Sequence, residues 1–388
     1  MVTSVISKGV GPTIVIPTTT DWDVKREGGT ESFIRNLARE GSRRGVPIQI
    51  LSTGENRWMD GSVEVRPIIG RTRSELSYVR ALRRKLKARE LSLPAEALVL
   101  ANAEHYVWPF MDTSGPVLMI AHGAVAPTLR FTRGRLKTLL FETMLEGRAV
   151  ARASRIAVVS EGTGDYYRNR FPRARFKIVQ VPFGIPLDDL PLPGTAPQRD
   201  RWGLGPDRPK VLFAGRLSKE KGLPLLLEAC GQVRAKGTPL QLVVAGDGPL
   251  RSWVVDQSAA RPWLRALGSV DHRDLMDLMV HCDLVAIASI YEGLPTVLLE
   301  ALSVGVPVVS TDVGRARELI GAASGVVVGR SPGEFADGIS RSSRLNRRET
   351  QEASKRLRPL LDFRHTADKI FELAQKVAAE ETQSAWMR

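Results

Sequence analysis

The chain has 388 residues, 43% of them hydrophobic and 25% charged, and a formal net charge of +14. This length exceeds what one hydrophobic core usually supports, and the composition is that of a soluble globular protein, so we expect two domains. With two cysteines and no apolar run long enough to cross a bilayer, the sequence excludes a disulfide scaffold and a transmembrane helix, and it favours a reducing cytoplasm. The first ten residues also lack the long apolar stretch of a signal peptide.

Short apolar runs alternate with helical patterns through the first half of the chain. Strands are predicted at residues 13–17, 46–51, 63–69, 97–101, 117–121, 156–159 and 176–181, and a helix at 31–44. Continuous apolar strands separated by helices predict a parallel sheet covered on both faces. Gly28 and Gly29, between the first strand and the first helix, can bring backbone N–H groups close to a phosphate, and they fit an ordinary turn equally.

A basic amphipathic segment occupies residues 71–89. Its cations are Arg71, Arg73, Arg80, Arg83, Arg84, Lys85, Lys87 and Arg89, and its apolar positions at helical spacing are Leu76, Val79, Leu82 and Leu86. Residues 1–190 carry 29 Lys and Arg against 19 Asp and Glu, whereas residues 191–388 carry 27 against 23. Such a helix is typical of a surface for anionic lipid or an acidic partner, and also of a solvated helix on a basic protein. Nucleic acid ranks third, because the segment has one aromatic residue and the chain has no Cys/His finger spacing.

His122 follows the predicted strand 117–121 and precedes Gly123. A histidine at the carboxyl end of a strand can donate to a sugar hydroxyl or to a carbonyl near a reacting carbon. It can equally be a structural histidine whose hydrogen bonds are satisfied. The residues alone leave both interpretations open.

Pro and Gly crowd residues 182–209, which predicts a connection between domains. Beyond it, strands are predicted at 210–214, 240–245, 284–288, 306–310 and 325–328, and helices at 223–236, 250–259, 273–281, 332–341 and 364–381. The expected fold class is α/β, with two doubly wound Rossmann-like domains that face each other across a cleft. The expected domains are residues 1–190, joined by a C-terminal helix at 365–388, and residues 191–364. Ligands of such sheets bind beyond the carboxyl ends of the strands.

Two cations follow the strand 210–214. Arg216 and Lys221 lie in the loop before the next helix, where a bidentate Arg and a point-charge Lys can hold a diphosphate. Fixed cations can stabilise the charge on a departing nucleoside diphosphate without a metal ion. Asp-x-Asp, a divalent-cation anchor, occurs only as Asp21-Trp22-Asp23 in the first half. A solvated charged loop is the alternative.

A second glycine loop follows the strand 240–245. Gly246 and Gly248 fit a close approach of the backbone to a ligand, and they also fit any left-handed turn.

The segment 289–302 is the most informative part of the chain. Gly293 permits a tight turn after Glu292, and Pro295 has the φ angle favoured at the first position of a helix. Thr296 then begins a mostly apolar helix that should end near Gly305.

This geometry places Glu292 on a loop and Glu300 on the first turns of the helix, about 8–12 Å apart at a rise of about 1.5 Å per residue. The pair suits two hydroxyl-rich parts of one elongated ligand, with N–H groups of the helix start between them for an anion. The helix dipole favours a carboxylate near the helix start in any case. Glu300, however, lies among leucines and needs a partner.

In these motifs the second half resembles the donor domain of retaining glycosyltransferases with the GT-B fold, family 4 or group 1 in the usual classification. The resemblance covers residues 211–320 in the family's order and spacing. It comprises Phe213-Ala214-Gly215-Arg216, Lys221-Gly222, Gly246-Asp247-Gly248-Pro249, Glu292-Gly293-Leu294-Pro295, Glu300-Ala301, Gly305-Val306-Pro307-Val308-Val309, and Thr311-Asp312-Val313-Gly314 with Glu318. The first half is similar more loosely, through Gly28-Gly29-Thr30-Glu31, His122-Gly123 and Ser160-Glu161.

The resemblance implies a role for each matching residue. Arg216 and Lys221 would bind the donor diphosphate, and Gly29 would lie near the phosphates. Glu292 would hold hydroxyls of the donor sugar, Glu300 would bind the ribose hydroxyls, and His122 would contact the sugar at the reaction centre. The implied catalytic residues are His122, Glu292, Arg216 and Lys221, and the further donor-binding residues are Gly246, Gly248, Gly293, Leu294, Pro295 and Thr296.

The family transfers a sugar from a nucleoside diphosphate with retention at the anomeric carbon by front-side attack, and the leaving phosphate helps to accept the proton of the acceptor. No metal or other cofactor is expected. Two departures from the family pattern stand out. Phe183-Gly184-Ile185-Pro186 replaces the common Asn-Gly-Val-Asp, which puts polar contacts there in doubt, and Arg315 stands where a second glycine is common. A charged residue near the donor sugar can change donor choice.

We therefore expect a hexosyltransferase that uses a UDP-sugar in preference to a GDP-sugar, with a glycan or lipid-linked acceptor in envelope polysaccharide synthesis. It should be cytoplasmic, with residues 71–89 as a candidate contact to the inner face of the membrane. The alternatives are a GT-B-like epimerase and a non-catalytic nucleotide-sugar-binding or scaffold protein.

Overall fold

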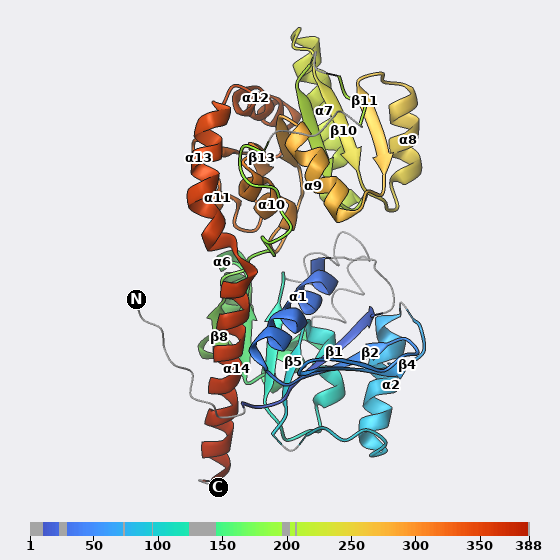
Figure 1. The fold of residues 1–388 in the computed structure, drawn as a ribbon, viewed down its shortest axis with the longest axis vertical. Coiled ribbons are helices and arrows are strands. Elements are labelled where there is room, and N and C mark those ends of the chain that lie inside the picture. The colour runs from blue at the N-terminus through green and yellow to red at the C-terminus, as the bar shows by residue number, and fades with distance from the viewer. Residues whose placement is uncertain are drawn as a thin grey trace. The chain divides into compact units, whose positions relative to one another are not determined.

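The computed structural model describes residues 11–22, 29–72, 74–94, 96–123, 145–195, 202–205 and 208–386. Its contacts divide the chain into two compact units (Figure 1). Unit 1 comprises Met1–Val159, Thr163–Pro182 and Thr366–Arg388, and unit 2 comprises Ser160–Gly162 and Phe183–His365. The main segment of unit 2 thus begins at Phe183, whereas the sequence places the domain boundary after residue 190.

Unit 1 is built on an eight-stranded sheet in the order β3-β4-β2-β1-β5-β6-β7-β8. Its strands are β1 Ile14–Asp21, β2 Ile48–Thr53, β3 Trp58–Asp60, β4 Val63–Ile69, β5 Leu98–Ala101, β6 Val117–Ala121, β7 Arg155–Val158 and β8 Ile178–Gln180. Neighbouring strands are parallel except for β3, which pairs antiparallel with β4. The sequence does not predict β3, because three residues at a sheet edge, with Met59 exposed, carry no apolar run.

The helices of the first half include α1 Gly29–Arg44, α2 Glu75–Lys87, α5 Gly147–Arg152 and α6 Glu161–Arg170, with short 3₁₀ helices at Glu104–Tyr106, Trp108–Phe110 and Pro172–Lys177. Strands β5 and β6 are buried at every position, as their continuous apolar sequences predict.

Helix α2 is the basic amphipathic helix, and one expectation about its apolar face is wrong. Leu76 is 58% exposed, whereas Tyr78 is fully buried. The Tyr78 hydroxyl donates to the Leu51 carbonyl and accepts the Thr18 N–H at 3.1 Å. With its hydroxyl hydrogen-bonded in this way, Tyr78 occupies the core position that the sequence assigns to Leu76.

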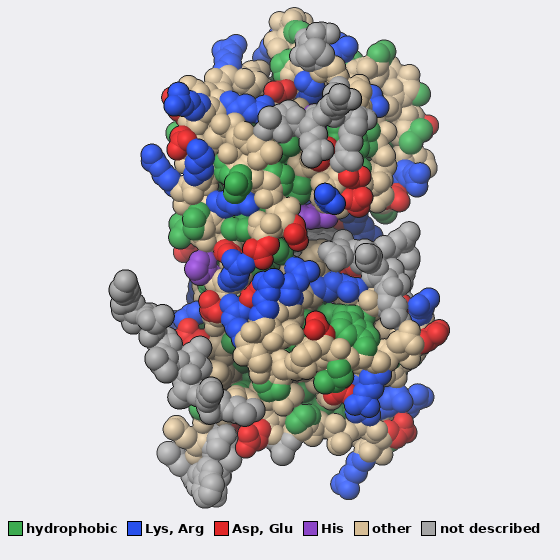
Figure 2. All heavy atoms as spheres, in the orientation of Figure 1, with side chains coloured by type: hydrophobic (Ala, Val, Ile, Leu, Met, Phe, Trp, Pro, Cys, Tyr) green, Lys and Arg blue, Asp and Glu red, His purple; other side chains and the backbone are tan. Residues whose placement is uncertain are grey.

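Several cations of the 71–89 segment have acidic partners. Arg83 and Lys87 both lie near Asp112, with N–O distances of 2.8 and 3.3 Å, and Lys85 lies 3.8 Å from Glu90. On the face shown in Figure 2, Lys and Arg side chains are interspersed with Asp and Glu side chains. Among the helices in the described ranges, none combines the length and apolar content needed to span a bilayer.

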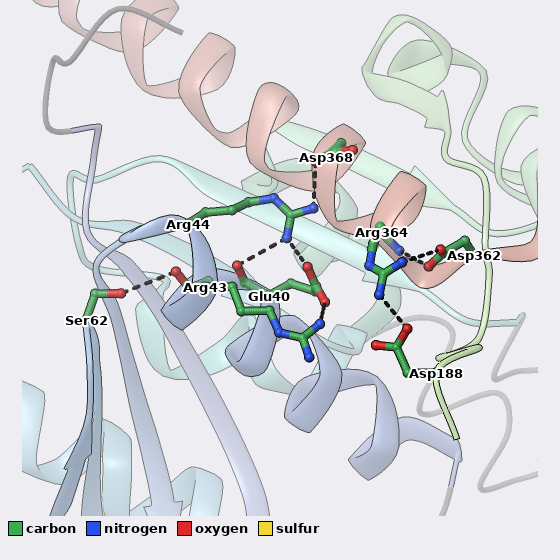
Figure 3. A network of polar contacts seen from close by, with 9 residues as sticks. Glu40, Arg43, Arg44, Ser62, Asp188, Asp362, Arg364 and Asp368 are labelled. Atoms are coloured by element: carbon green, nitrogen blue, oxygen red, sulfur yellow. Dashed lines mark hydrogen bonds and ion pairs between the residues drawn. The ribbon is translucent and has the colours of Figure 1, made fainter. Parts of the chain in front are cut away.

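The C-terminal helix α14, Phe363–Trp386, begins in unit 2 and continues in unit 1 from Thr366. Its apolar positions Ile370, Phe371 and Val377 are buried. The last turn of α1 contacts it through Arg44, whose Nη2 lies 2.9 Å from Asp368, while Glu40 accepts bonds from both Arg43 and Arg44 (Figure 3). The Arg44–Asp368 ion pair and the buried apolar face hold α14 against the rest of unit 1.

Unit 2 contains a six-stranded parallel sheet in the order β11-β10-β9-β12-β13-β14. Its strands are β9 Lys210–Ala214, β10 Gln241–Ala245, β11 Leu264–Gly268, β12 Leu284–Ile287, β13 Val308–Thr311 and β14 Gly325–Val328. Its helices include α7 Leu223–Ala235, α8 Arg251–Ala259, α9 His272–His281, α10 Thr296–Val304, α11 Ala316–Leu319, α12 Pro332–Ser342 and α13 Arg347–Leu357, with 3₁₀ helices at Lys219–Lys221 and Arg358–Leu361. The sequence misses β11, whose residues after Leu264 are not fully buried, and α13, which is strongly polar.

Both sheets reverse their strand order at one place. In unit 1 the reversal lies between β1 and β5, and in unit 2 it lies between β9 and β12. Such a switch point is where the loops from adjacent strands diverge, and ligands of open α/β sheets bind there, beyond the carboxyl ends of the strands.

Candidate active site

The switch point of unit 2 brings two predicted site residues into direct contact. Lys221 lies in the loop after β9, and Glu292 lies in the loop after β12. Lys221 Nζ lies 2.5 Å from Glu292 Oε1, with side-chain exposures of 27% and 15%. The Ser289 hydroxyl donates to the same carboxylate oxygen at 2.8 Å. The sequence predicts both charged groups but not their ion pair, nor the contribution of Ser289.

Backbone contacts fix these two loops to each other. The Ile290 N–H donates to the Glu220 carbonyl at 2.7 Å. Gly222 ends the 3₁₀ helix at a φ of +67°, and a Cβ there would lie 1.9 Å from the Ala288 carbonyl oxygen. Only glycine fits this close approach, so Lys221 and Glu292 are positioned by the backbone as well as by their charges.

The loops after β9 and β10 are joined in the same way. The Leu217 N–H donates to the Asp247 carbonyl at 2.9 Å. Gly246 has a φ of +148°, and a Cβ on it would lie 1.8 Å from the Gly215 carbonyl oxygen; Gly248 has a φ of +153°. Arg216 is exposed on this paired loop. The predicted glycines therefore serve backbone packing between the loop after β10 and the loop after β9, which carries both candidate diphosphate cations.

Helix α10 carries the second predicted carboxylate. Pro295 precedes the helix as its N-cap in an extended conformation rather than occupying the first helical position, so that Thr296 is the first residue and Gly305 ends the helix at a φ of +76°. Glu300 is 8% exposed among buried neighbours. Its Oε1 lies 2.9 Å from His272 Nε2, which supplies the partner that a buried carboxylate requires.

The loop after β13 packs against the loop that carries Gly293, Leu294 and Pro295. A Cβ on Gly314, whose φ is +57°, would lie 2.9 Å from the Gly293 carbonyl oxygen and 3.0 Å from Pro295 Cδ. The next residue, Arg315, bonds through Nε to Glu318 Oε2 at 2.6 Å. Arg315 thus directly follows the glycine that packs against the candidate donor loop, and its side chain is paired with Glu318.

In unit 1, His122 follows β6, and its ring is packed into the protein. His122 Nε2 lies 2.6 Å from Asn102 Oδ1, and the ring meets Phe33 edge to face with centroids 4.8 Å apart. Burial lowers the pKa of His122 from 6.5 to about 4. Gly29 begins α1, and Gly28 lies outside the described residues. Sequence reasoning misses Asn102, although a polar residue directly after a buried strand is a usable signal.

The low pKa of His122 predicts a dependence of stability on pH. Between pH 4 and 6.5 the unfolded chain binds a proton that the folded chain does not, so the free energy of unfolding falls as the pH falls through this window. The free energy of unfolding changes by about 1.4 kcal/mol per pH unit for one proton. His122 can therefore account for a loss of at most about 2 kcal/mol at pH 5. Urea unfolding at pH 7 and pH 5 should show that His122→Gln loses less stability in acid than the wild type.

His365→Gln removes an exposed histidine and should behave as the wild type does in this experiment. If His122→Gln and the wild type lost the same free energy of unfolding between pH 7 and pH 5, the low pKa would not belong to His122.

The two doubly wound sheets define the class of proteins with the GT-B fold, and the sheet of unit 2 has glycine loops and a charged pair at its carboxyl edge. Residues 27–189 match the model of the family described as Glycosyltransferase Family 4, and residues 195–357 match that of Glycosyl transferases group 1. The two matches cover successive parts of the chain and together support a group 1 glycosyltransferase with the GT-B fold.

Curated relatives agree with this assignment over different lengths. Alpha-D-kanosaminyltransferase of Streptomyces kanamyceticus is 35% identical over 149 residues, which are 37% of this chain and 38% of that protein. EpsF of Bacillus subtilis, named as a glycosyltransferase, is 25% identical over 338 residues, 82% of this chain and 86% of that protein. The chain thus matches little more than a third of the first of these relatives and most of the second.

Solved structures show the same fold. Sucrose-phosphate synthase from Thermosynechococcus elongatus has a TM-score of 0.77 at 18% identity, covering 95% of this chain and 100% of that chain. The lipopolysaccharide glycosyltransferase WaaG has a TM-score of 0.71 at 16% identity, covering 93% and 99%. HepE from Anabaena in complex with UDP and glucose has a TM-score of 0.69 at 18% identity, covering 94% and 100%.

Proposed function

We propose that this protein is a retaining, metal-independent glycosyltransferase that moves a hexosyl unit from a nucleoside-diphosphate sugar to a glycan or lipid-linked acceptor. The observation that carries the proposal is the Lys221–Glu292 ion pair at the switch point of unit 2. A fixed ammonium beside a fixed carboxylate matches the junction in a nucleotide sugar between an anionic diphosphate and a hydroxyl-rich sugar.

In this proposal Arg216 and Lys221 bind the diphosphate and stabilise the charge that grows on it as the sugar leaves. Glu292 accepts hydrogen bonds from hydroxyls of the sugar, and Glu300 accepts them from the ribose. The low pKa of His122 keeps its imidazole neutral, which suits a hydrogen bond to a sugar hydroxyl. The leaving phosphate helps to accept the proton of the acceptor hydroxyl, which then attacks from the same face.

Two sets of similar proteins support the choice of substrates. HepE has been solved with UDP, with UDP and glucose, and with UDP-glucose, which supports a UDP-sugar in preference to a GDP-sugar as donor. TuaC of Bacillus subtilis, named for teichuronic acid biosynthesis, is 36% identical over 123 residues, and WaaG takes part in lipopolysaccharide biosynthesis. These names support an acceptor in cell-envelope or exopolysaccharide synthesis.

A thermal-shift panel of UDP- and GDP-sugars tests the proposed donor. A donor present at about 100 times its Kd should stabilise the protein by about 2.7 kcal/mol and raise the Tm by several degrees. The shift should persist in EDTA and should be lost in Glu292→Ala if the sugar is the part recognised there. A panel in which no nucleotide or nucleotide sugar raises the Tm would count against donor binding altogether.

Product analysis then separates the reaction classes. Transfer to an added acceptor with the anomeric configuration retained supports the proposal, and interconversion of the donor sugar without an acceptor supports an epimerase. A Glu292→Ala protein that keeps its fold and its cellular function would indicate a non-catalytic binding or scaffold role.

We also propose that the basic helix α2 contacts an anionic membrane surface where a lipid-linked acceptor would lie. Arg80 and Arg84 are exposed on this helix. Sedimentation with vesicles rich in phosphatidylglycerol should show binding that weakens when salt is raised and when both arginines are changed to Gln. Equal sedimentation of the variant and the wild type would remove α2 from this role.

A further inference from the structure

The second carboxylate of the candidate donor site has a partner that the sequence motifs do not contain. His272 Nε2 lies 2.9 Å from Glu300 Oε1, and the side chains are 55% and 11% exposed. Because an ionised carboxylate only accepts hydrogen bonds, the proton lies on Nε2 and the imidazole donates it. In the part of the chain that the structure describes, no other side chain bonds to the Glu300 carboxylate.

The position of His272 is fixed independently of Glu300. It is the first residue of α9, and the preceding Asp271 caps that helix by accepting the Asp274 N–H at 2.9 Å. The strand before α9 ends at Gly268, whose carbonyl accepts the Gly246 N–H at 2.7 Å. Helices α9 and α10 also pack against each other. The backbone of His272 is therefore held at the carboxyl edge of the sheet by the cap of α9, and the preceding strand is bonded to the glycine loop after β10.

The Glu300 side chain needs such an anchor. It projects from a mostly apolar helix in which Leu298, Leu299 and Leu302 are buried. A carboxylate offers about four lone-pair positions on two oxygens, and His272 uses one of them on Oε1. With Oε1 held, the rotation of the carboxylate is restricted and the direction of Oε2 is set.

We propose that His272 is a positioning residue that holds Glu300 in the orientation in which Oε2 accepts the ribose hydroxyls of the donor nucleotide. The inference rests on the proposed function, in which Glu300 binds the ribose. It adds a residue outside the matching motifs, on α9, to the recognition of the nucleoside. A histidine that served only the fold would affect all nucleotides alike, whereas a positioning role is specific to those with ribose hydroxyls.

Calorimetric titration of UDP and 2′-deoxy-UDP, and of GDP and 2′-deoxy-GDP, measures this specificity. The wild type should bind the ribonucleotide at least about tenfold more tightly than its deoxy analogue, because a site built for a hydroxyl leaves a polar group unpaired without it. His272→Ala should weaken ribonucleotide binding by about five- to tenfold and leave the deoxy analogue nearly unchanged. Its KM for the donor should rise while kcat stays within about twofold.

Four further variants make the test decisive. His272→Gln keeps an amide donor of similar reach and should retain most of the ribose preference. Glu300→Ala should abolish the preference, and the double variant His272→Ala with Glu300→Ala should bind no more weakly than Glu300→Ala alone, because the two residues act as one unit. Arg273→Ala, an exposed neighbour on the same helix turn, should leave the ratio of the two affinities unchanged.

The outcomes separate the two levels of the proposal. If His272→Ala keeps the full ribose preference while Glu300→Ala loses it, the positioning role is overturned and the ribose role of Glu300 stands. If Glu300→Ala also keeps the preference, both the positioning role and the assignment of Glu300 to the ribose are overturned. Loss of affinity for ribo- and deoxynucleotides by the same factor in His272→Ala would assign the histidine to the fold alone.

Discussion

Replacing Lys221 by Ala is expected to lower kcat/KM for sugar transfer by about 10²- to 10³-fold, the cost of removing one preorganised group that stabilises charge in a transition state. The ammonium lies 2.5 Å from Glu292 and is 27% exposed, so its charge is held in place before the donor arrives. Steady-state kinetics with a donor that gives a positive thermal shift would measure the loss.

The ion pair further predicts that Lys221 and Glu292 act together. Glu292→Ala should lower kcat/KM by a similar factor. It removes one carboxylate that has two proposed roles, since it orients both the sugar and the Lys221 ammonium. The double variant should lose about as much as the more damaging single variant, rather than the product of the two losses. A multiplicative loss would show that the pair does not act as a unit during the reaction.

Lys219→Ala provides the matched control. Lys219 lies in the same 3₁₀ helix as Lys221 but is exposed. Its removal should change kcat/KM by less than about threefold, because a solvated surface charge contributes little. If Lys219→Ala were as damaging as Lys221→Ala, the general positive charge of the loop would be the active feature, and the ion pair would lose its special role.

Gly246→Ala is expected to destabilise unit 2 by about 3–5 kcal/mol, from backbone strain together with a steric clash. The φ of +148° is accessible almost only to glycine, and the added Cβ would lie 1.8 Å from the Gly215 carbonyl oxygen. Urea unfolding followed by circular dichroism would measure the loss. The same variant should bind UDP weakly, because the clash separates the two loops at the candidate diphosphate site.

Two other glycines separate strain from clash. Gly215 has a φ of +145°, but a Cβ there meets no atom within 4 Å, so Gly215→Ala should cost only the strain, about 1–3 kcal/mol. Gly231 lies in helix α7 with open space beside it, and Gly231→Ala should stabilise the protein by about 0.5–1 kcal/mol. A Gly246→Ala protein as stable as Gly231→Ala would show that the two loops are not packed as described.

The architecture was largely predictable because parallel strands that are buried on both faces have continuous apolar sequences. Strand β6 at Val117–Ala121 and strand β9 at Lys210–Ala214 have the predicted bounds. The elements missed include the edge strands β3 and β11 and the polar helix α13, which lack such a signal. In α2 the helical spacing was right, but the core took the buried phenol of Tyr78 in place of Leu76, since spacing alone does not tell which neighbouring apolar side chain finds a partner.

Local patterns in the sequence place Arg216, Lys221, Glu292 and Glu300 after strands of one Rossmann-like domain, because turn glycines, apolar runs and helix starts are local properties of the chain. The packing of distant segments makes β9 and β12 neighbours, and it thereby brings Lys221 into contact with Glu292. It alone also joined His272 to Glu300. Strand order and side-chain direction arise from packing between segments far apart in the chain, and no local pattern encodes them.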